Sequence, residues 1–99
     1  MYACRFETCL MGADSQVWLT RNGELPFIPV EGMTLTFGPA QNYTIASVIY
    51  DHRDRRFDVV VDAFPGFEHE QSFDRFVEDL CRVEGWRHQS GLPALIDAG

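Results

Sequence analysis

The stretch NYTIASVIYDHRDRRFDVVVDAFPG, residues 42–66, indicates which class of fold the chain can form. It contains two apolar runs rich in β-branched residues, at about 43–50 and 57–64, which are separated by six polar residues. Such runs are typical of β-strands, and a short polar segment between them predicts a hairpin. Pro65, which has no N–H group, and Gly66 end the second strand. The stretch therefore predicts a β-rich fold with a charged hairpin tip.

The two strands of this hairpin differ in how clearly their faces are defined. In the second strand, apolar side chains at every odd position from 57 to 63 share one face, while Asp58 and Asp62 point the other way. In the first strand, Ile45 and Ile49 fall on one side, whereas Val48 and Tyr50 fall on the other. A shift of one residue would move every side chain to the opposite face. The register of 43–50 against 57–64 therefore stays open.

Three further segments have strand character. Residues 3–10 alternate between apolar and charged side chains, as a half-buried strand does. Residues 16–28 contain Asn22-Gly23 between two apolar runs, and this dipeptide predicts a type I′ hairpin turn. The segment GMTLTFG, residues 32–38, is a short apolar run bounded by glycines. Together with the hairpin, these segments predict about five to six strands between residues 3 and 64.

One helix is expected after the strands, at about residues 72–84. Ser72 is a suitable N-cap, and Gly85 suits the position that follows a helix end. Apolar side chains recur at helical spacing and form one stripe, made of Phe73, Phe76, Val77 and Leu80. The tail, residues 87–99, has no regular period and is expected to be partly irregular.

These elements predict a single α+β domain over residues 1–99. The expected architecture is a small, strongly bent antiparallel sheet or an SH3-like partial barrel, followed by one C-terminal helix. A hydrophobic content of 45% is that of a folded domain. Trp18 and Trp86 could lie in its core or at an interface, and the sequence leaves both alternatives open.

The charge and hydropathy of the sequence limit which partners and which cellular compartment can be expected. The net charge of −7 argues against direct binding of nucleic acid, because such binding depends on neutralising phosphates. The apolar runs are far shorter than the ~20 residues that cross a bilayer. Arg5 and Glu7 interrupt the apolar region that a signal peptide would need. We therefore expect a cytoplasmic protein with no membrane contact and no direct contact with nucleic acid.

Cysteine spacing gives no sign of a disulfide framework or of a cofactor. Cys4, Cys9 and Cys81 are an odd number and form no C-x-x-C pair, so we expect free thiols. Neither the cysteine nor the histidine spacing supplies a closed set of metal ligands, and no metal or cofactor is predicted. One alternative is a small metal- or thiol-dependent enzyme that uses Glu68, His69 or a cysteine.

The hairpin tip is the first candidate binding site. An arginine patch beside aromatic residues can recognise a carboxylate, a phosphate or an aromatic group on a partner. The candidate partner-binding residues are Tyr50, His52, Arg53, Arg55 and Arg56. They favour a non-catalytic protein-binding or regulatory module with a protein partner.

A second candidate surface lies on the predicted helix. Asp74, Glu78 and Asp79 face away from its apolar stripe and form an acidic surface. Such a surface could imitate the charge of nucleic acid and bind a basic partner. The alternative function is therefore an acidic inhibitor that blocks a nucleic-acid-binding protein. The oligomeric state and the identity of any partner are left open.

Overall fold

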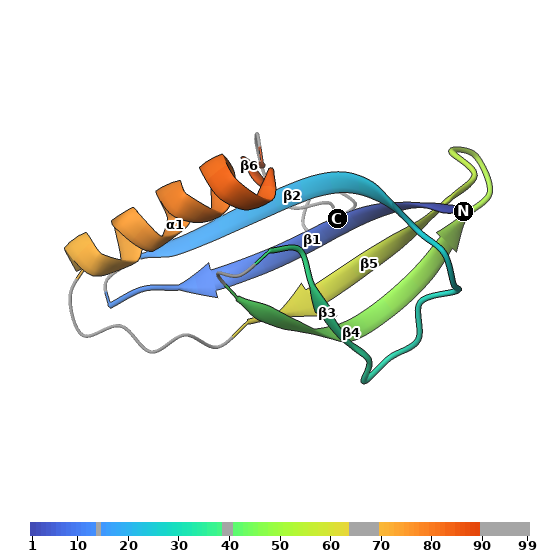
Figure 1. Cartoon of the computed structure of the whole chain (residues 1–99), viewed down its shortest axis with the longest axis horizontal. Coiled ribbons are helices and arrows are strands. Elements are labelled where there is room, and N and C mark those ends of the chain that lie inside the picture. The colour runs from blue at the N-terminus through green and yellow to red at the C-terminus, as the bar shows by residue number, and fades with distance from the viewer. Residues whose placement is uncertain (14, 39–40, 64–69, 90–99) are drawn as a thin grey trace, which may run out of the picture.

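Six strands form one mixed, open sheet, and a single helix packs against it, within the part of the chain that the structure describes (Figure 1). This computed structural model describes residues 1–13, 15–38, 41–63 and 70–89. The elements are β1 (Tyr2–Met11), β2 (Gln16–Leu25), β3 (Thr34–Thr36), β4 (Asn42–Asp51), β5 (Arg56–Asp62), α1 (Glu70–Glu84) and β6 (Arg87–His88). The α+β class and the C-terminal helix are as predicted.

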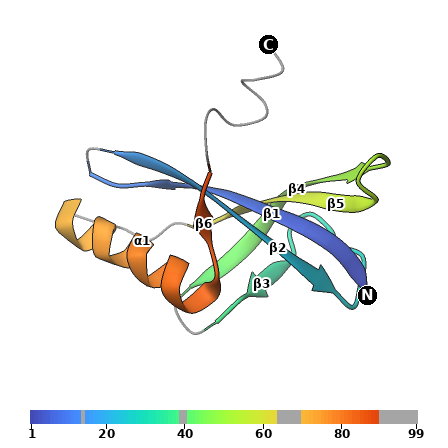
Figure 2. The same ribbon diagram turned by 90° about the horizontal axis from the view of Figure 1, so that it is seen from above.

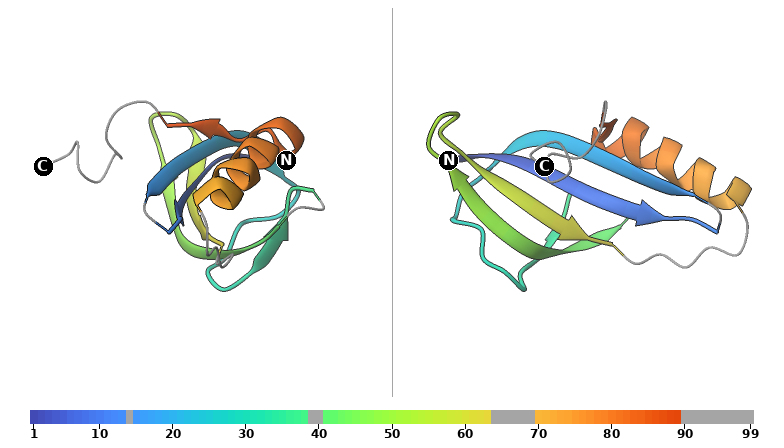
Figure 3. Two further views of the ribbon diagram at one scale, coloured as in Figure 1. Left: turned by 90° about the vertical axis from the view of Figure 1, so that its left-hand side faces the viewer. Right: turned by 180° about the vertical axis from the view of Figure 1, so that it is seen from behind.

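The strand order is β3-β4-β5-β1-β2-β6. Strands β1 and β5 pair in parallel at the centre of the sheet, whereas every other neighbouring pair is antiparallel. The prediction of an antiparallel sheet was therefore wrong. Parallel neighbours need a long connection, and here the chain between them runs through β2, β3 and β4. In the described part of the chain, the sheet curls strongly but does not close into a barrel (Figure 3).

The Asn22-Gly23 turn predicted from the sequence is absent, because both residues lie inside β2. Strands β1 and β2 pair without interruption, from Tyr2 opposite Leu25 to Met11 opposite Gln16. The chain instead reverses direction between Met11 and Gln16, and the Gly12 N–H donates there to the Ser15 carbonyl at 2.8 Å. Pairing along the full length of two ten-residue strands has overridden the local turn propensity of Asn-Gly.

A β-bulge resolves the open register of the β4–β5 hairpin. Ile45 pairs with Val61 and Ser47 with Val60, so Ala46 is the extra residue. The bulge moves the rest of β4 by one position, and Val48 then shares a face with Ile45. Ile49 is left on the other face and is 63% exposed.

Helix α1 lies alongside β1 and β2, on the side toward which the sheet curls (Figures 2 and 3). It begins at Glu70, so the predicted cap at Ser72 was wrong and Ser72 lies inside the helix. Its end at Glu84 is as predicted, and Gly85 follows with a φ of 78°. Three side chains of its apolar stripe, those of Phe73, Val77 and Leu80, are buried in the core, whereas that of Phe76 is only partly buried.

The chain continues past the helix into β6, which pairs with the outer edge of β2. The first residues of the predicted irregular tail are thus part of the sheet, and the remainder, from residue 90 on, lies outside the described residues. In the described ranges, no helix is both long enough and apolar enough to cross a membrane.

Candidate functional site

The tip of the β4–β5 hairpin is an ordered turn that Asp51 holds in place. Its carboxylate accepts hydrogen bonds from the N–H groups of Arg53 at 2.9 Å and Asp54 at 3.3 Å. These bonds, with that of Asp54 first, hold the pKa of Asp51 below its usual value because they favour the charged form. Arg55 has a φ of 53°, a left-handed conformation that is uncommon outside glycine. These contacts therefore hold the tip in one defined turn conformation.

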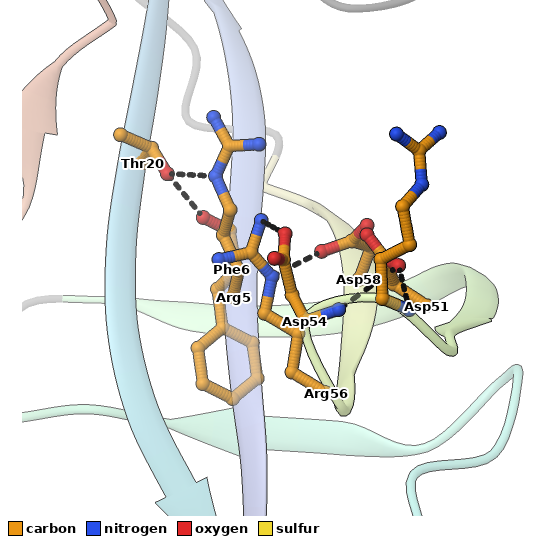
Figure 4. A network of polar contacts seen from close by, with 8 residues as sticks. Arg5, Phe6, Thr20, Asp51, Asp54, Arg56 and Asp58 are labelled. Carbon is orange, nitrogen blue, oxygen red and sulfur yellow. Dashed lines mark hydrogen bonds and ion pairs between the residues drawn. The ribbon is translucent and has the colours of Figure 1, made fainter.

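Arg56 belongs to the framework of the tip. Its Nε lies 3.1 Å from Oδ1 of Asp58, and its Nη2 lies 3.4 Å from Oδ2 of Asp54 (Figure 4). Because two carboxylates already hold this guanidinium, Arg56 is the least available of the three predicted arginines. The prediction treated the three as equivalent, and the structure distinguishes Arg56 from the others.

Arg53 and Arg55 are the exposed cations of the tip. Within the described residues, neither guanidinium forms an ion pair. Both side chains thus keep all five N–H donors available for a carboxylate or phosphate on another molecule.

Four aromatic rings form a continuous row that runs from β1 to the hairpin tip, which we call the aromatic row: Tyr2, Phe57, Tyr50 and His52. Successive ring centroids are 6.1, 5.0 and 5.1 Å apart, and all three pairs meet edge to face. Tyr2 is 41% exposed and Tyr50 is 45% exposed. Edge-to-face pairs are favourable arrangements of aromatic side chains. The row therefore presents a partly apolar surface that reaches the tip at His52, the residue directly before Arg53.

An open hollow of about 380 Å³ lies at the base of the tip. Its lining residues are Ala3, Cys4, Asn22, Gly23, Glu24, Asp54 and Arg56. Two of these lining residues, Ala3 and Glu24, pair with each other across the β1–β2 hairpin. This hollow could not be predicted from the sequence, because it joins β1, β2 and the tip through the parallel β1–β5 pairing.

The alternative acidic surface is present on the helix, but its three residues differ. Asp74 and Glu78 are exposed. Asp79 is partly buried and forms an ion pair with Arg82, whose Nη2 lies 2.8 Å from Oδ1. The surface that a basic partner could contact therefore consists mainly of Asp74 and Glu78.

The metal- or thiol-dependent alternative involves Glu68, His69 and the cysteines. Glu68 and His69 lie outside the described residues. Among the residues described, no three His, Cys, Asp or Glu side chains are placed to hold a metal ion together. Burial raises the pKa of the Cys4 and Cys81 thiols, which lowers the fraction of reactive thiolate at neutral pH.

A buried polar cluster around Glu84 was not predicted. Glu84 is 3% exposed, and its Oε1 accepts hydrogen bonds from the Tyr43 hydroxyl at 2.8 Å and the Trp86 indole at 3.3 Å. Arg21 donates to the Glu84 backbone carbonyl at 2.6 Å and lies over the Phe37 ring, 4.4 Å from its centroid. The cluster thus joins the end of the helix to β2, β4 and the segment after β3.

The sequence did contain one signal of this cluster. Glu84 is an acid in the last turn of a helix, where the helix dipole disfavours negative charge. An acid in that position, directly before Gly85 and Trp86, indicates a compensating tertiary contact. The sequence left open whether Trp86 lies in the core or at an interface. Trp86 is 1% exposed and lies in the core. Trp18 is partly buried.

Burial of Tyr43 predicts an alkaline loss of stability. Burial, followed by the hydrogen bond and the charge of Glu84, raises the pKa of the Tyr43 phenol well above its ordinary value of about 10. The fold therefore favours the protonated phenol, and this stabilisation is complete below about pH 10 and is lost as the pH rises above it. In urea unfolding at pH 8 and pH 11, the stability gap between wild type and Tyr43→Phe should narrow at the higher pH. An equal gap at both pH values would contradict the prediction.

Comparison with known proteins gave no match to a family model, a curated protein or a solved structure. The geometry of the tip is therefore the basis for the functional proposal.

Proposed function

We propose that the chain is a non-catalytic protein-binding or regulatory module, and that the tip of the β4–β5 hairpin is its binding site. The observation that carries this proposal is the pair of free guanidinium groups, Arg53 and Arg55, on a turn fixed by Asp51. A fixed turn loses little conformational entropy when it binds, so more of the contact energy is available for affinity.

The chemistry of the tip favours an acidic protein segment that also carries an apolar or aromatic side chain. Arginine pairs with carboxylates through two parallel hydrogen bonds, and the aromatic row offers apolar area beside them. Arginine and tyrosine are also among the residues that contribute most to interface energies. The chain as a whole carries a net charge of −7, so its surfaces away from the tip would repel such a segment. Electrostatics therefore direct an acidic partner to the tip.

The proposal also includes three expectations about the type of partner, contact with nucleic acid and cellular location. The partner is a protein, direct contact with nucleic acid is not involved, and the location is cytoplasmic. The net charge supports the second of these, and the three free thiols agree with a reducing compartment. An SH3-like relationship of the bent sheet also remains a proposal, and the number and lengths of the strands support it.

Charge reversal at the tip tests the proposal. The double variant Arg53→Glu and Arg55→Glu should keep its fold, because each change at an exposed position costs within ~0.5 kcal/mol. Its affinity for a partner captured from the native cell should fall about tenfold or more, because like charges then face each other. The loss should shrink at high salt, where charges are screened. Arg56 is left unchanged because its substitution would disturb the framework of the tip.

The matched control reverses two exposed acids of the helix, Asp74→Lys and Glu78→Lys. Under the proposal, this variant captures the partner as well as wild type does. If it loses the partner while the tip variant keeps it, the helix surface is the binding site and the acidic inhibitor is the better account. Normal capture by the tip variant, with an unchanged melting curve, would contradict the proposal directly.

A further inference from the structure

Among the residues that the structure describes, only part of the outer edge of β2 is covered. Strand β6 pairs with Leu19 and Thr20, and the Gln89 N–H donates to the Trp18 carbonyl at 3.0 Å. The Trp18 backbone therefore points away from β1 and toward this edge. Backbone groups of a strand alternate in direction, and the β1–β2 register is continuous. The N–H and C=O groups of Asn22 and Glu24 thus also point to the edge.

No backbone group within the described residues pairs with these four groups. The side chains of Asn22 and Glu24 are exposed as well. The open part of the edge is bounded on one side by Thr20, which β6 covers, and on the other by Pro26, which cannot donate a hydrogen bond. The unpaired segment, residues 21–25, is long enough to pair with one short strand. Unpaired edges of this kind readily accept another strand.

We propose that a second copy of this chain pairs with this edge, antiparallel, about a two-fold axis at Gly23. In this register Asn22 lies opposite Glu24 of the second copy, and Glu24 opposite its Asn22. Each of these two pairs exchanges two backbone hydrogen bonds, so four bonds satisfy all the open groups on both copies. Gly23 meets its own copy on the axis, where the absence of side chains lets the strands approach.

Side-chain complementarity selects this register and favours a second copy as the occupant. The Asn22 amide can donate to the Glu24 carboxylate opposite it, and an isologous interface makes this contact twice. An axis at Glu24 would instead place two carboxylates face to face, which is unfavourable across paired strands. The interface is small and each copy carries a charge of −7, so the dimer is weak and is strengthened by salt.

Two substitutions at one exposed position test this dimer. Asn22→Lys places a cation opposite Glu24 in both symmetric pairs, whereas Asn22→Asp places an anion there. Sedimentation equilibrium of the full chain, up to about 1 mM protein, should give a dissociation constant about tenfold lower for Asn22→Lys than for wild type. For Asn22→Asp it should be about tenfold higher. Both differences should shrink as salt is added.

Glu78→Lys on the helix controls for net charge. It raises the net charge by two, whereas Asn22→Lys raises it by one, so an effect of net charge alone would be larger for the helix variant. The proposal predicts a dissociation constant closer to wild type for Glu78→Lys than for Asn22→Lys. Monomers for all variants at every concentration, or equal association of Asn22→Lys and Asn22→Asp, would overturn the proposed dimer. Neither result would bear on binding at the hairpin tip.

Discussion

Replacing Phe73 with alanine is expected to destabilise the protein by about 3–5 kcal/mol, because the change removes a buried ring and leaves a cavity. Phe73 lies in the first half of α1 and has no exposed surface. Its ring packs directly against Gly12, the residue after β1. A Cβ atom at Gly12 would lie only 2.5 Å from the Phe73 ring. Urea unfolding of wild type and variant measures the loss directly.

Phe76→Ala is the matched comparison for this prediction. Both phenylalanines belong to the apolar stripe seen in the sequence, but Phe76 is only partly buried. Its replacement should therefore cost clearly less than that of Phe73. Equal losses, or a larger loss at Phe76, would mean that the helix presents a different face to the sheet.

Glu84→Ala is expected to cost about 3–5 kcal/mol, the second large effect, because it leaves two buried hydrogen-bond donors without an acceptor. The Tyr43 hydroxyl and the Trp86 indole would each lose their acceptor in the core. A buried donor without a partner costs about 1–3 kcal/mol. The loss appears in urea unfolding as a lower midpoint.

Glu84→Gln keeps the volume of the side chain and one acceptor oxygen, and removes the negative charge. Its amide oxygen can still accept from Tyr43, so we expect a loss of about 1–2 kcal/mol, well below that of the alanine variant. If both variants were as stable as wild type, Glu84 would not hold the helix end to the sheet as the structure indicates.

The strands and the helix could largely be predicted from local sequence, because alternation and helical spacing record burial directly. The odd positions of β5 and the stripe at Phe73, Val77 and Leu80 both face the core as expected. The β4–β5 hairpin and its polar tip were also predicted correctly. In each of these elements, the local pattern and the tertiary contacts agree.

Three features could not be predicted because long-range pairing determines them. Asn22-Gly23 has the composition of a turn, but the full pairing of β1 with β2 keeps it extended. The bulge at Ala46 leaves no local signal except the broken alternation of β4. The parallel contact of β1 with β5 joins segments about 50 residues apart, from Cys4 to Phe57, and nothing in either segment specifies its direction.

The candidate site could also be predicted only in part from the sequence. Its residue types were evident from the sequence, since three arginines and a histidine stand in a polar hairpin tip. The structure adds what the tip can do, because Asp51 fixes the turn, Arg56 is already held, and Tyr2 joins the aromatic row from a distant part of the chain. Tyr2 could not be identified without the β1–β5 pairing.

Amide hydrogen exchange, measured with and without the captured partner, is the most direct test of the binding site. If the partner binds the tip, exchange should be slower at residues 50–57 and unchanged over the acidic surface of the helix, residues 74–79. Slower exchange confined to residues 74–79, with no change at the tip, would contradict binding at the tip.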